Sequence, residues 1–272
     1  MGSAKEADAD ERATWQPIKR QIETHVARLF NARGFARRRG RCFYRHFDNR
    51  VEVIELRFLR ALGRRVEKSM GKGEADFDLP AGVFFTRVPD YSLHGLVEKD
   101  GRLLPTEPEC HVRFSPIVPF GHFGRPRHHW HVAKGQESVS QALGEIEEVL
   151  DTSLQTFFDQ FSNEEKAIDF IGHHPDPGPD KGPWGYGPKD GMSWNWLNGF
   201  LGRHLGRFEQ AEESLKTVLR LNDEWRDKSL ATWKGEAKRC EQINAFWQMT
   251  RDRSLAELER IANAREFRGR DT

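Results

Sequence analysis

Hydrophobic residues recur at three- and four-residue intervals between residues 18 and 30, which is the spacing of one face of an α-helix. The apolar face consists of Ile18, Ile22, Val26, Leu29 and Phe30. Gly34 follows at a position where glycine commonly ends a helix. The pattern predicts an amphipathic helix, and the polar residues 1–13 before it are expected to be disordered.

Two β-rich runs, residues 42–47 and 50–58, flank an Asp48-Asn49 pair that favours a tight turn. In the second run hydrophobic and polar residues alternate, which predicts an antiparallel hairpin in a sheet covered on one side. The hydrophobic positions are Ile54, Leu56 and Phe58. Further strands are expected at residues 77–85, with Pro80 at an edge or bulge, at 110–114 and at 129–132.

Helical spacing returns after the strands. Residues 136–161 predict one helix long enough to cross a sheet, and Ser162 with Glu165 matches a capping box for the next helix. The order of helix, antiparallel strands and helices is typical of an α+β fold, because each element needs a partner for its apolar face. We therefore expect an α+β domain over residues 14–172.

Residues 173–192 are rich in proline and glycine, which disrupt both helices and strands. They are predicted to be a linker. Trp184 and Tyr186 leave open whether this segment packs on a neighbouring domain or is solvated. After the linker the period is helical throughout, so residues 193–268 are predicted to form a small all-α domain of helical hairpins.

Four helices are expected in this domain. The first is marked by Trp194, Leu197 and Leu201, the second by Ala211, Leu215, Val218 and Leu219, the third by Leu230, Trp233, Ala237, Cys240 and Trp247, and the fourth by Leu255, Leu258 and Ile261. The pair Ser254 and Glu257 is expected to cap the fourth helix at its start.

The N-terminal region resembles the uncharacterised bacterial group called domain of unknown function 4304, over residues 16–165. The resemblance lies in the order of a helix, Gly34-Phe35, the strands Phe43-Tyr44-Arg45 and Val53-Ile54-Glu55-Leu56, a strand with Phe84, Cys110-His111-Val112-Arg113-Phe114, Trp130 and a long helix ending in Phe157-Phe158. It implies an α+β domain with no established activity and no catalytic residues to transfer.

The second region resembles a tetratricopeptide-type helical hairpin more weakly. Gly199, Gly206, Ala211 and Leu215 have the spacing of its small and turn positions, whereas Gly202 replaces the usual tyrosine. Small residues let two helices approach closely. A generic helical hairpin accounts for the same residues.

Composition limits the classes of protein to which this chain can belong. The chain has 272 residues, with 37% hydrophobic and 31% charged, and no run of about 20 apolar residues that could span a membrane. The N-terminus lacks the apolar stretch of a secretion signal. Cys42, Cys110 and Cys240 are too few and too far apart for a disulfide framework, which favours a cytoplasmic location.

Potential metal ligands are concentrated between residues 111 and 131, where five histidines lie. A strand would place His129 and His131 on one face, and His111 on a neighbouring strand could add a third nitrogen. No carboxylate or thiolate set supports a metal site, so solvent-facing histidines are the preferred interpretation. No metal or other cofactor is expected.

Nucleophilic catalysis has little support either. Strand alternation would place Cys110 and His111 on opposite faces, and Cys110 is expected to lie in the core with Val112 and Phe114. The sequence contains no GxSxG motif, P-loop or dinucleotide-binding fingerprint. Whether the protein is an enzyme stays open, and the absence of catalytic motifs favours a non-enzymatic role.

Charge is distributed unevenly. Residues 11–72 hold 17 Lys+Arg and 6 Asp+Glu, whereas residues 137–170 hold one Lys and nine acids. The candidate binding residues of this basic stretch are Arg37, Arg38, Arg39, Arg41, Arg45, Arg57 and Arg60. With Phe43 and Tyr44 between them, they could bind phosphates while the rings stack on bases. The acidic helix could instead neutralise these strands within the fold.

These features favour a non-enzymatic protein-binding module of a bacterial cytoplasm, by analogy an immunity or antitoxin-like protein, with another protein as partner. Nucleic-acid binding through residues 37–65 is the alternative hypothesis. A metal-dependent hydrolase that uses the histidines of residues 111–131 is the third. No membrane partner is expected.

Overall fold

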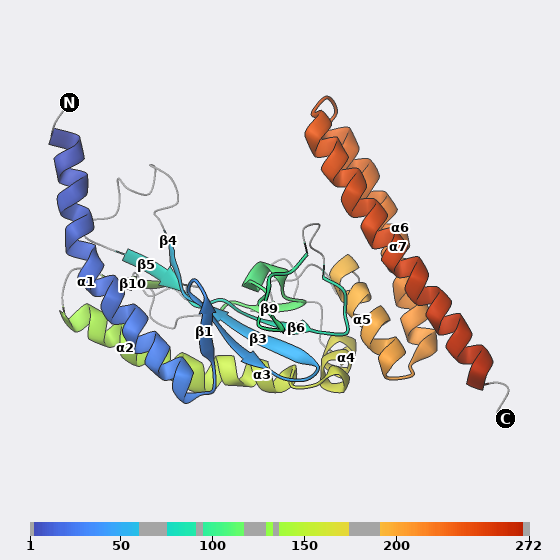
Figure 1. Ribbon diagram of the computed structural model, residues 1–272, viewed down its shortest axis with the longest axis horizontal. Helices are drawn as coiled ribbons and strands as arrows, with labels where there is room; N and C mark the ends of the chain where they lie inside the picture. The colour runs from blue at the N-terminus through green and yellow to red at the C-terminus, as the bar shows by residue number, and fades with distance from the viewer. Residues whose placement is uncertain are drawn as a thin grey trace.

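The computed structural model describes residues 3–59, 75–90, 95–116, 129–132, 136–173 and 191–268. It has the expected fold class: an antiparallel sheet with helices, followed by an all-helical region (Figure 1). The helices are α1 (Ser3–Ala32), α2 (Gln136–Val149), the π-helical η2 (Leu150–Leu154), α3 (Gln155–Gln160), α4 (Glu164–His173), α5 (Met192–His204), α6 (Phe208–Thr232) and α7 (Ala237–Arg268), with the short 3-10 helix η1 (Glu107–Glu109).

Two long, interrupted strands form the centre of the sheet. One consists of β3 (Arg50–Glu55) and β4 (Arg57–Leu59), and the other of β5 (Ala75–Asp78) and β6 (Ala81–Phe85). Pro80 lies in the second interruption, as expected, because proline cannot donate to the ladder. The remaining strands are β1 (Ala36–Arg39), β2 (Cys42–His46), β7 (Glu98–Lys99), β8 (Arg102–Leu103), β9 (Val112–Phe114) and β10 (Trp130–Val132).

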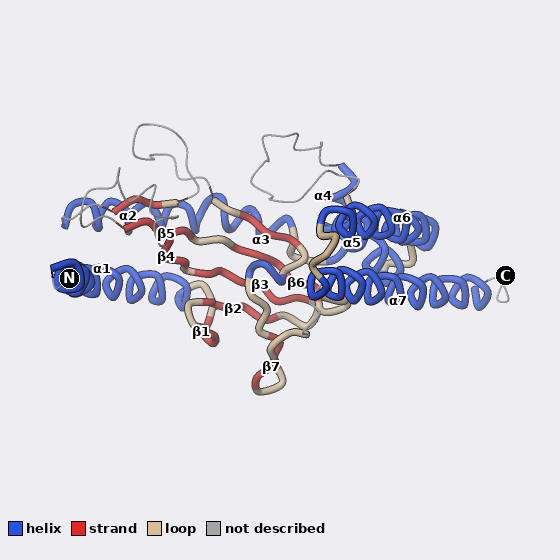
Figure 2. Tube along the Cα trace, turned by 90° about the horizontal axis from the view of Figure 1, so that it is seen from above, coloured by secondary structure: helices blue, strands red, loops and turns tan. Residues whose placement is uncertain are grey.

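All strand pairs are antiparallel, and their orders are β1-β2-β3-β6-β9, β10-β5-β4 and β7-β8. The predicted hairpin of β2 and β3 is confirmed, with Tyr44 opposite Val53. The β7–β8 hairpin projects from the body of the molecule (Figure 2). β9 and β10 pair with different parts of the β5–β6 strand, which keeps these two edge strands apart along it.

One face of the sheet packs on α1 and on the continuous α2–η2–α3 segment (Figures 1 and 2). Ile22 and Val26 of α1 and Ile54 of β3 are fully buried in this main core. Gly34 ends α1 with φ of 82°, a conformation that glycine adopts without strain. The predicted amphipathic helix is therefore confirmed, although α1 begins at Ser3 within the segment that was expected to be disordered.

The prediction that the sheet is covered on one side is wrong. A second buried cluster lies on the other face, under residues 96–110, and it includes Tyr44, Val53, Phe84 and Leu104. Position 82 accepts only glycine without rearrangement, because a Cβ there would lie 2.5 Å from the Cβ of Cys110. Polar residues near Ile54 suggested an open face, but the chain folds the later segment 96–110 back over that face.

The helix start after α3 also differs from expectation. Asn163, rather than Ser162, caps α4, with its Oδ1 accepting from the Lys166 N–H at 2.8 Å. The Ser162 hydroxyl instead donates to the Asp159 carbonyl of the preceding helix. Asparagine is as good an N-cap as serine, so the position of the helix start decided which residue caps it.

The helical region contains three helices, so the expectation of four is wrong. α7 runs from Ala237 to Arg268 without a break, and Ser254, the expected cap, is fully buried in its middle. The Ser254 hydroxyl donates to the Thr250 carbonyl one turn earlier, which is a common use of serine inside a helix. The capping motif therefore matched by chance.

Buried residues from both regions belong to one contiguous core. Trp196 of α5 is fully buried, and its indole Nε1 donates to the Pro89 carbonyl at 3.0 Å. Arg253 of α7 is bonded to the carbonyl and carboxylate of Asp90. Residues 174–190, with Trp184 and Tyr186, lie outside the described residues, so the division into two domains stays a prediction.

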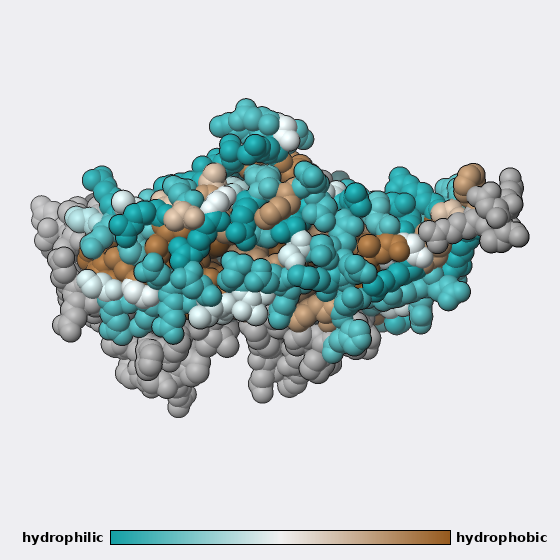
Figure 3. Space-filling view, turned by 90° about the horizontal axis from the view of Figure 1, so that it is seen from below, coloured by the Kyte–Doolittle hydropathy of each residue, from teal (hydrophilic) through white to brown (hydrophobic). Residues whose placement is uncertain are grey.

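The surface seen from below is mainly hydrophilic, with small separate hydrophobic patches (Figure 3). Within the described residues, none of the helices combines the length and the apolar character needed to cross a bilayer.

Candidate functional site

Arginines at the start of the basic stretch are paired with nearby acids. Arg41 donates through Nε to Oε1 of Glu23 in α1 at 2.7 Å, and Arg37 lies 3.8 Å from the same carboxylate. Arg39 lies 3.6 Å from Glu109. These side chains are partly or well exposed, so each pair contributes little stability. Their local positive charge is nevertheless reduced.

Arg45 lies deeper, in a buried ion-pair cluster. It donates to Glu52 at 2.6 Å, and Arg50 donates to the other oxygen of that carboxylate at 3.1 Å. Burial raises the pKa of Glu52, and the two arginines act against this shift. Arg45 also lies over the Phe35 ring, 4.6 Å from its centroid. This arginine stabilises the fold and is not available to a ligand.

Arg57 donates to both carboxylate oxygens of Asp78, at 3.0 and 2.8 Å. Arg38 is exposed, and within the described residues it forms no ion pair. Arg60 lies outside the described residues. Phe43 and Tyr44 are both buried, one in each core, so the described stretch offers neither ring for stacking on a base.

The acids that neutralise the basic strands lie mostly on or beside the sheet. The acidic helical segment contributes Asp151, which accepts from Arg33 at 2.9 Å. Farther along the same segment, Asp169 accepts from Arg207 of the helical region at 2.8 Å. Glu164 of this segment also lies 3.4 Å from Arg87, just after β6. Among the described pairs, Arg33 is therefore the only arginine of residues 11–72 that the segment neutralises, and it lies before β1 rather than on a strand.

His111 is buried, and both of its ring nitrogens are used. The Phe85 N–H donates to Nδ1 at 3.0 Å, so Nε2 carries the hydrogen and donates to the Pro89 carbonyl at 3.0 Å. Burial lowers its pKa to about 4. The expectation of a solvent-facing residue is wrong for His111, and it is not oriented as a metal ligand.

The structure does not bring the candidate histidines together. His111 precedes β9, whereas His129 precedes β10, which pairs farther along the β5–β6 strand. The His131 side chain lies outside what the structure describes. Among the described residues, no three His, Cys, Asp or Glu side chains are placed to hold a metal ion.

The two cysteines of the sheet are core residues. Cys42 and Cys110 are buried in the second cluster, and burial raises the pKa of both thiols, so they are protonated at neutral pH. Cys110 was expected to lie with Val112 and Phe114, but these two face the main core. Cys110 precedes β9, so strand alternation does not govern its direction.

The longest projecting feature is the hairpin of α6 and α7, whose far end extends beyond the sheet (Figure 1). We call residues 221–250 the arm. Asn222, Ile243 and Thr250 are its only buried residues. Two of these three are polar, and the Asn222 Oδ1 and Thr250 Oγ1 atoms have no hydrogen-bond partner within the described chain. The contact between the two helices of the arm is therefore narrow and weakly hydrophobic.

Aromatic side chains lie partly exposed on two flanks of the arm. On one flank Trp225 packs edge-on against Phe246, with 5.0 Å between ring centroids. On the other, Trp247 donates to Asp223 at 2.6 Å and lies under Arg226 at 4.3 Å. At the tip, Trp233 is 37% exposed and lies 3.6 Å below Arg239.

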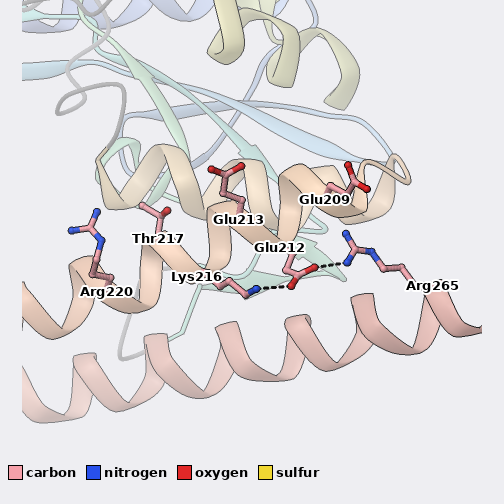
Figure 4. Close-up of a pocket in the computed structure, with 7 residues that line it drawn as sticks. All are labelled: Glu209, Glu212, Glu213, Lys216, Thr217, Arg220 and Arg265. Atoms are coloured by element: carbon pink, nitrogen blue, oxygen red, sulfur yellow. Dashed lines mark hydrogen bonds and ion pairs between the residues drawn. The ribbon is translucent and has the colours of Figure 1, made fainter.

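A hollow of about 490 Å³ lies between α6 and α7 near the base of the hairpin (Figure 4). Its central carboxylate, Glu212, accepts from Lys216 at 2.6 Å and is also bonded to Arg265. Hydrogen bonding to Lys216 is the main cause that lowers the pKa of Glu212. Glu212 is therefore neutralised by its two partners, whereas Glu209 and Glu213, which also line the hollow, form no ion pair within the described residues.

The arm was missed in the sequence, although its spacing could have revealed it. The residues on the buried face of α7 recur at alternating intervals of four and three, which is a heptad spacing. They are Ile243, Trp247, Thr250, Ser254, Glu257 and Ile261. Three of them are polar, so a search for hydrophobic periodicity divided α7 into two helices.

Comparisons of this chain with protein-family models, curated proteins and solved structures find no match. The two resemblances noted in the sequence therefore stay predictions. The close approach of α5 and α6 is present, since a Cβ on Gly199 would lie 2.5 Å from Leu215, but a generic helical hairpin accounts for it equally.

Proposed function

We propose that the protein is a non-enzymatic protein-binding module and that the arm is its binding surface. The supporting observation is that the arm exposes Trp225 and Trp233 by 36% and 37% while burying only three of its own residues. Tryptophan and arginine are the residues most enriched at energetically important positions of protein interfaces. The arm combines both, and a narrow helical pair gains stability when a partner covers it.

The alternative hypotheses receive less support. The described arginines of the basic stretch are largely paired, and Phe43 and Tyr44 are buried, which argues against a base-stacking surface. His111 uses both ring nitrogens in the fold, which weakens the hydrolase hypothesis. A cytoplasmic location remains part of the proposal, because all three cysteines are free thiols.

The test is affinity capture from the native host with a shortened hairpin as the comparison. Asn222 of α6 donates to the Trp247 carbonyl of α7 at 2.9 Å, so residues 223–246, which include Trp225, Trp233 and Phe246, can be replaced by a short glycine-containing turn that joins the two helices. We expect the full-length protein to capture a specific protein that the shortened variant does not capture. The shortened variant should remain folded, as measured by circular dichroism. Equal capture by both proteins, or recovery of RNA or DNA in place of a protein, would contradict the proposal.

A further inference from the structure

The two flanks of the arm differ in charge. One row on α6 contains Leu221, Trp225 and Lys228, which share a face because they are three or four residues apart. The adjacent row on α7 contains Phe246 and Met249. We call these two rows the Trp225 flank. Its remaining members are Thr232 on α6 and Lys238, Gln242 and Arg253 on α7.

Neither row of the Trp225 flank contains an Asp or Glu. Lys228 and Lys238 are exposed at its border, whereas Arg253 is already bonded to Asp90. On the other flank Asp223 pairs with Trp247 and lies 3.9 Å from Arg251, so charges there are balanced locally. The two rows of the Trp225 flank are therefore apolar along their centre and carry two exposed cations, and no anion, toward the tip.

The same side of the hairpin is covered nearer its base. There α5 contributes Arg203, which is bonded to Glu257 of α7, and the end of the β6 connection contributes Asp90, which is bonded to Arg253. Toward the tip, Trp225 is 36% exposed, and within the described chain its indole N–H has no hydrogen-bond partner. Toward the tip, the same side of the hairpin therefore continues as a strip that none of the described segments covers.

We propose that the Trp225 flank binds an acidic amphipathic helix of a partner protein, which packs as a third helix along α6 and α7. This proposal rests on the proposed function of the arm. Aromatic and aliphatic side chains at one-turn spacing accept the apolar face of a helix. Glu or Asp residues on the borders of that helix would meet Lys228 and Lys238.

A second copy of this chain is a poorer occupant of the same strip. Two-fold pairing would place the same surface of each copy against the other and bring the basic borders together. Like charges at an interface disfavour association. Charge complementarity therefore selects a partner helix with acidic borders.

A designed helical peptide provides the direct test. It carries Leu at positions i, i+3, i+4 and i+7 and Glu at the flanking positions, and a matched peptide carries Lys in place of Glu. Titration into the full-length protein is followed by fluorescence anisotropy of a labelled peptide. We expect saturable binding of the Glu peptide, at least about 10-fold weaker binding of the Lys peptide, and weakening of the Glu peptide by added salt.

Variants locate the site. Trp225→Ala should weaken the Glu peptide by at least about 10-fold, as loss of a central aromatic residue does at an interface. Lys228→Glu with Lys238→Glu should reverse the preference between the two peptides. Phe267→Ala, which removes an exposed aromatic residue of α7 outside the arm, is the control and should leave binding unchanged. Equal binding of both peptides, or equal losses for Trp225→Ala and Phe267→Ala, would overturn the inference.

The two proposals can fail separately. If the shortened hairpin loses the native partner but Trp225→Ala retains it, the arm binds a protein through another surface, and only the acidic-helix inference fails. If the shortened hairpin retains that partner, both fail. Concentration-dependent dimerisation of the wild type that Trp225→Ala abolishes would also overturn the inference in favour of a second copy.

Discussion

The role of an individual residue in this protein depends more on whether its side chain is buried than on its residue type. His111 was a candidate metal ligand, but its two hydrogen bonds join the end of β6 to the Pro89 carbonyl. Trp196 donates to the same carbonyl. One neutral histidine therefore fixes the segment on which the helical region docks.

Protonation of His111 should destabilise the fold. Its pKa is lowered from 6.5 to about 4 by burial, so below pH 6.5 the unfolded chain binds a proton that the folded protein does not. The contribution of this residue to stability is complete above pH 6.5 and is lost as the pH falls toward 4. We expect the free energy of unfolding in urea to fall by about 2 kcal/mol from this cause between pH 6.5 and 5.

The His111→Gln variant is the control for this measurement, because Glu52 and other buried acids also titrate on the acidic side. Glutamine offers a carbonyl acceptor and an NH2 donor group and does not titrate in this range. The variant should therefore show a shallower loss of stability between pH 6.5 and 5 than the wild type. Identical pH profiles for the two proteins would show that His111 is not held in its neutral form.

At the scale of elements, the α6–α7 hairpin changes character along its length. Near its base Leu215, Val218 and Ile261 are buried and hydrophobic, whereas farther out the contact includes Asn222 and Thr250. Polar residues at such positions lower stability but can define which helices pair and in which register. The arm is thus a continuation of the hairpin whose own packing is weak.

Replacing Thr250 by Val should strengthen the hairpin. The Thr250 hydroxyl is fully buried, and no hydrogen-bond partner is found for it among the described residues. Removing a buried polar atom without a partner relieves a desolvation cost of about 1 to 3 kcal/mol. We expect Thr250→Val to raise the urea midpoint. Ser254→Ala is the matched control one turn away, because its hydroxyl does have a partner, the Thr250 carbonyl. If Ser254→Ala stabilised the protein as much, general hydrophobicity would be the cause.

At the scale of the whole molecule, the sheet and the helical region are joined by a continuous core. Trp194, Leu197 and Phe200 of α5 belong to the same buried cluster as Phe157 and Phe161 of the α+β region. Hydrogen bonds to Pro89 and Asp90 add a polar contact on the other side of the junction. A break in the backbone within the predicted linker should therefore divide the chain into two fragments that remain associated.

Cleavage within the linker tests this junction. A specific protease site inserted after Lys181 should allow complete cleavage, because proline- and glycine-rich segments accept insertions and proteolysis. We expect the two fragments to elute together in gel filtration and to separate only in denaturant. Trp196→Ala should make them separate more readily, since it removes a fully buried side chain and its hydrogen bond. Independent elution of wild-type fragments in buffer would show instead two autonomous domains.

The sequence by itself determined the local elements. Spacing along the chain was sufficient for α1, the β2–β3 hairpin, the strand interruption at Pro80 and the helix after residue 136, because these depend on neighbours three or four positions away or across a short turn. It also identified α5 and the first part of α6, where Ala211, Leu215 and Val218 are buried and hydrophobic.

Only the tertiary structure decided which faces are covered and which charges are paired. Segment 96–110 covers the second face of the sheet, Glu23 and Glu109 lie beside Arg41 and Arg39, and the single helix α7 spans two predicted ones. Each depends on contacts between residues far apart in the chain, which local spacing does not encode. The arm is the clearest case. Polar side chains lie in the contact between its two helices, and their burial becomes evident only when α6 and α7 are packed together.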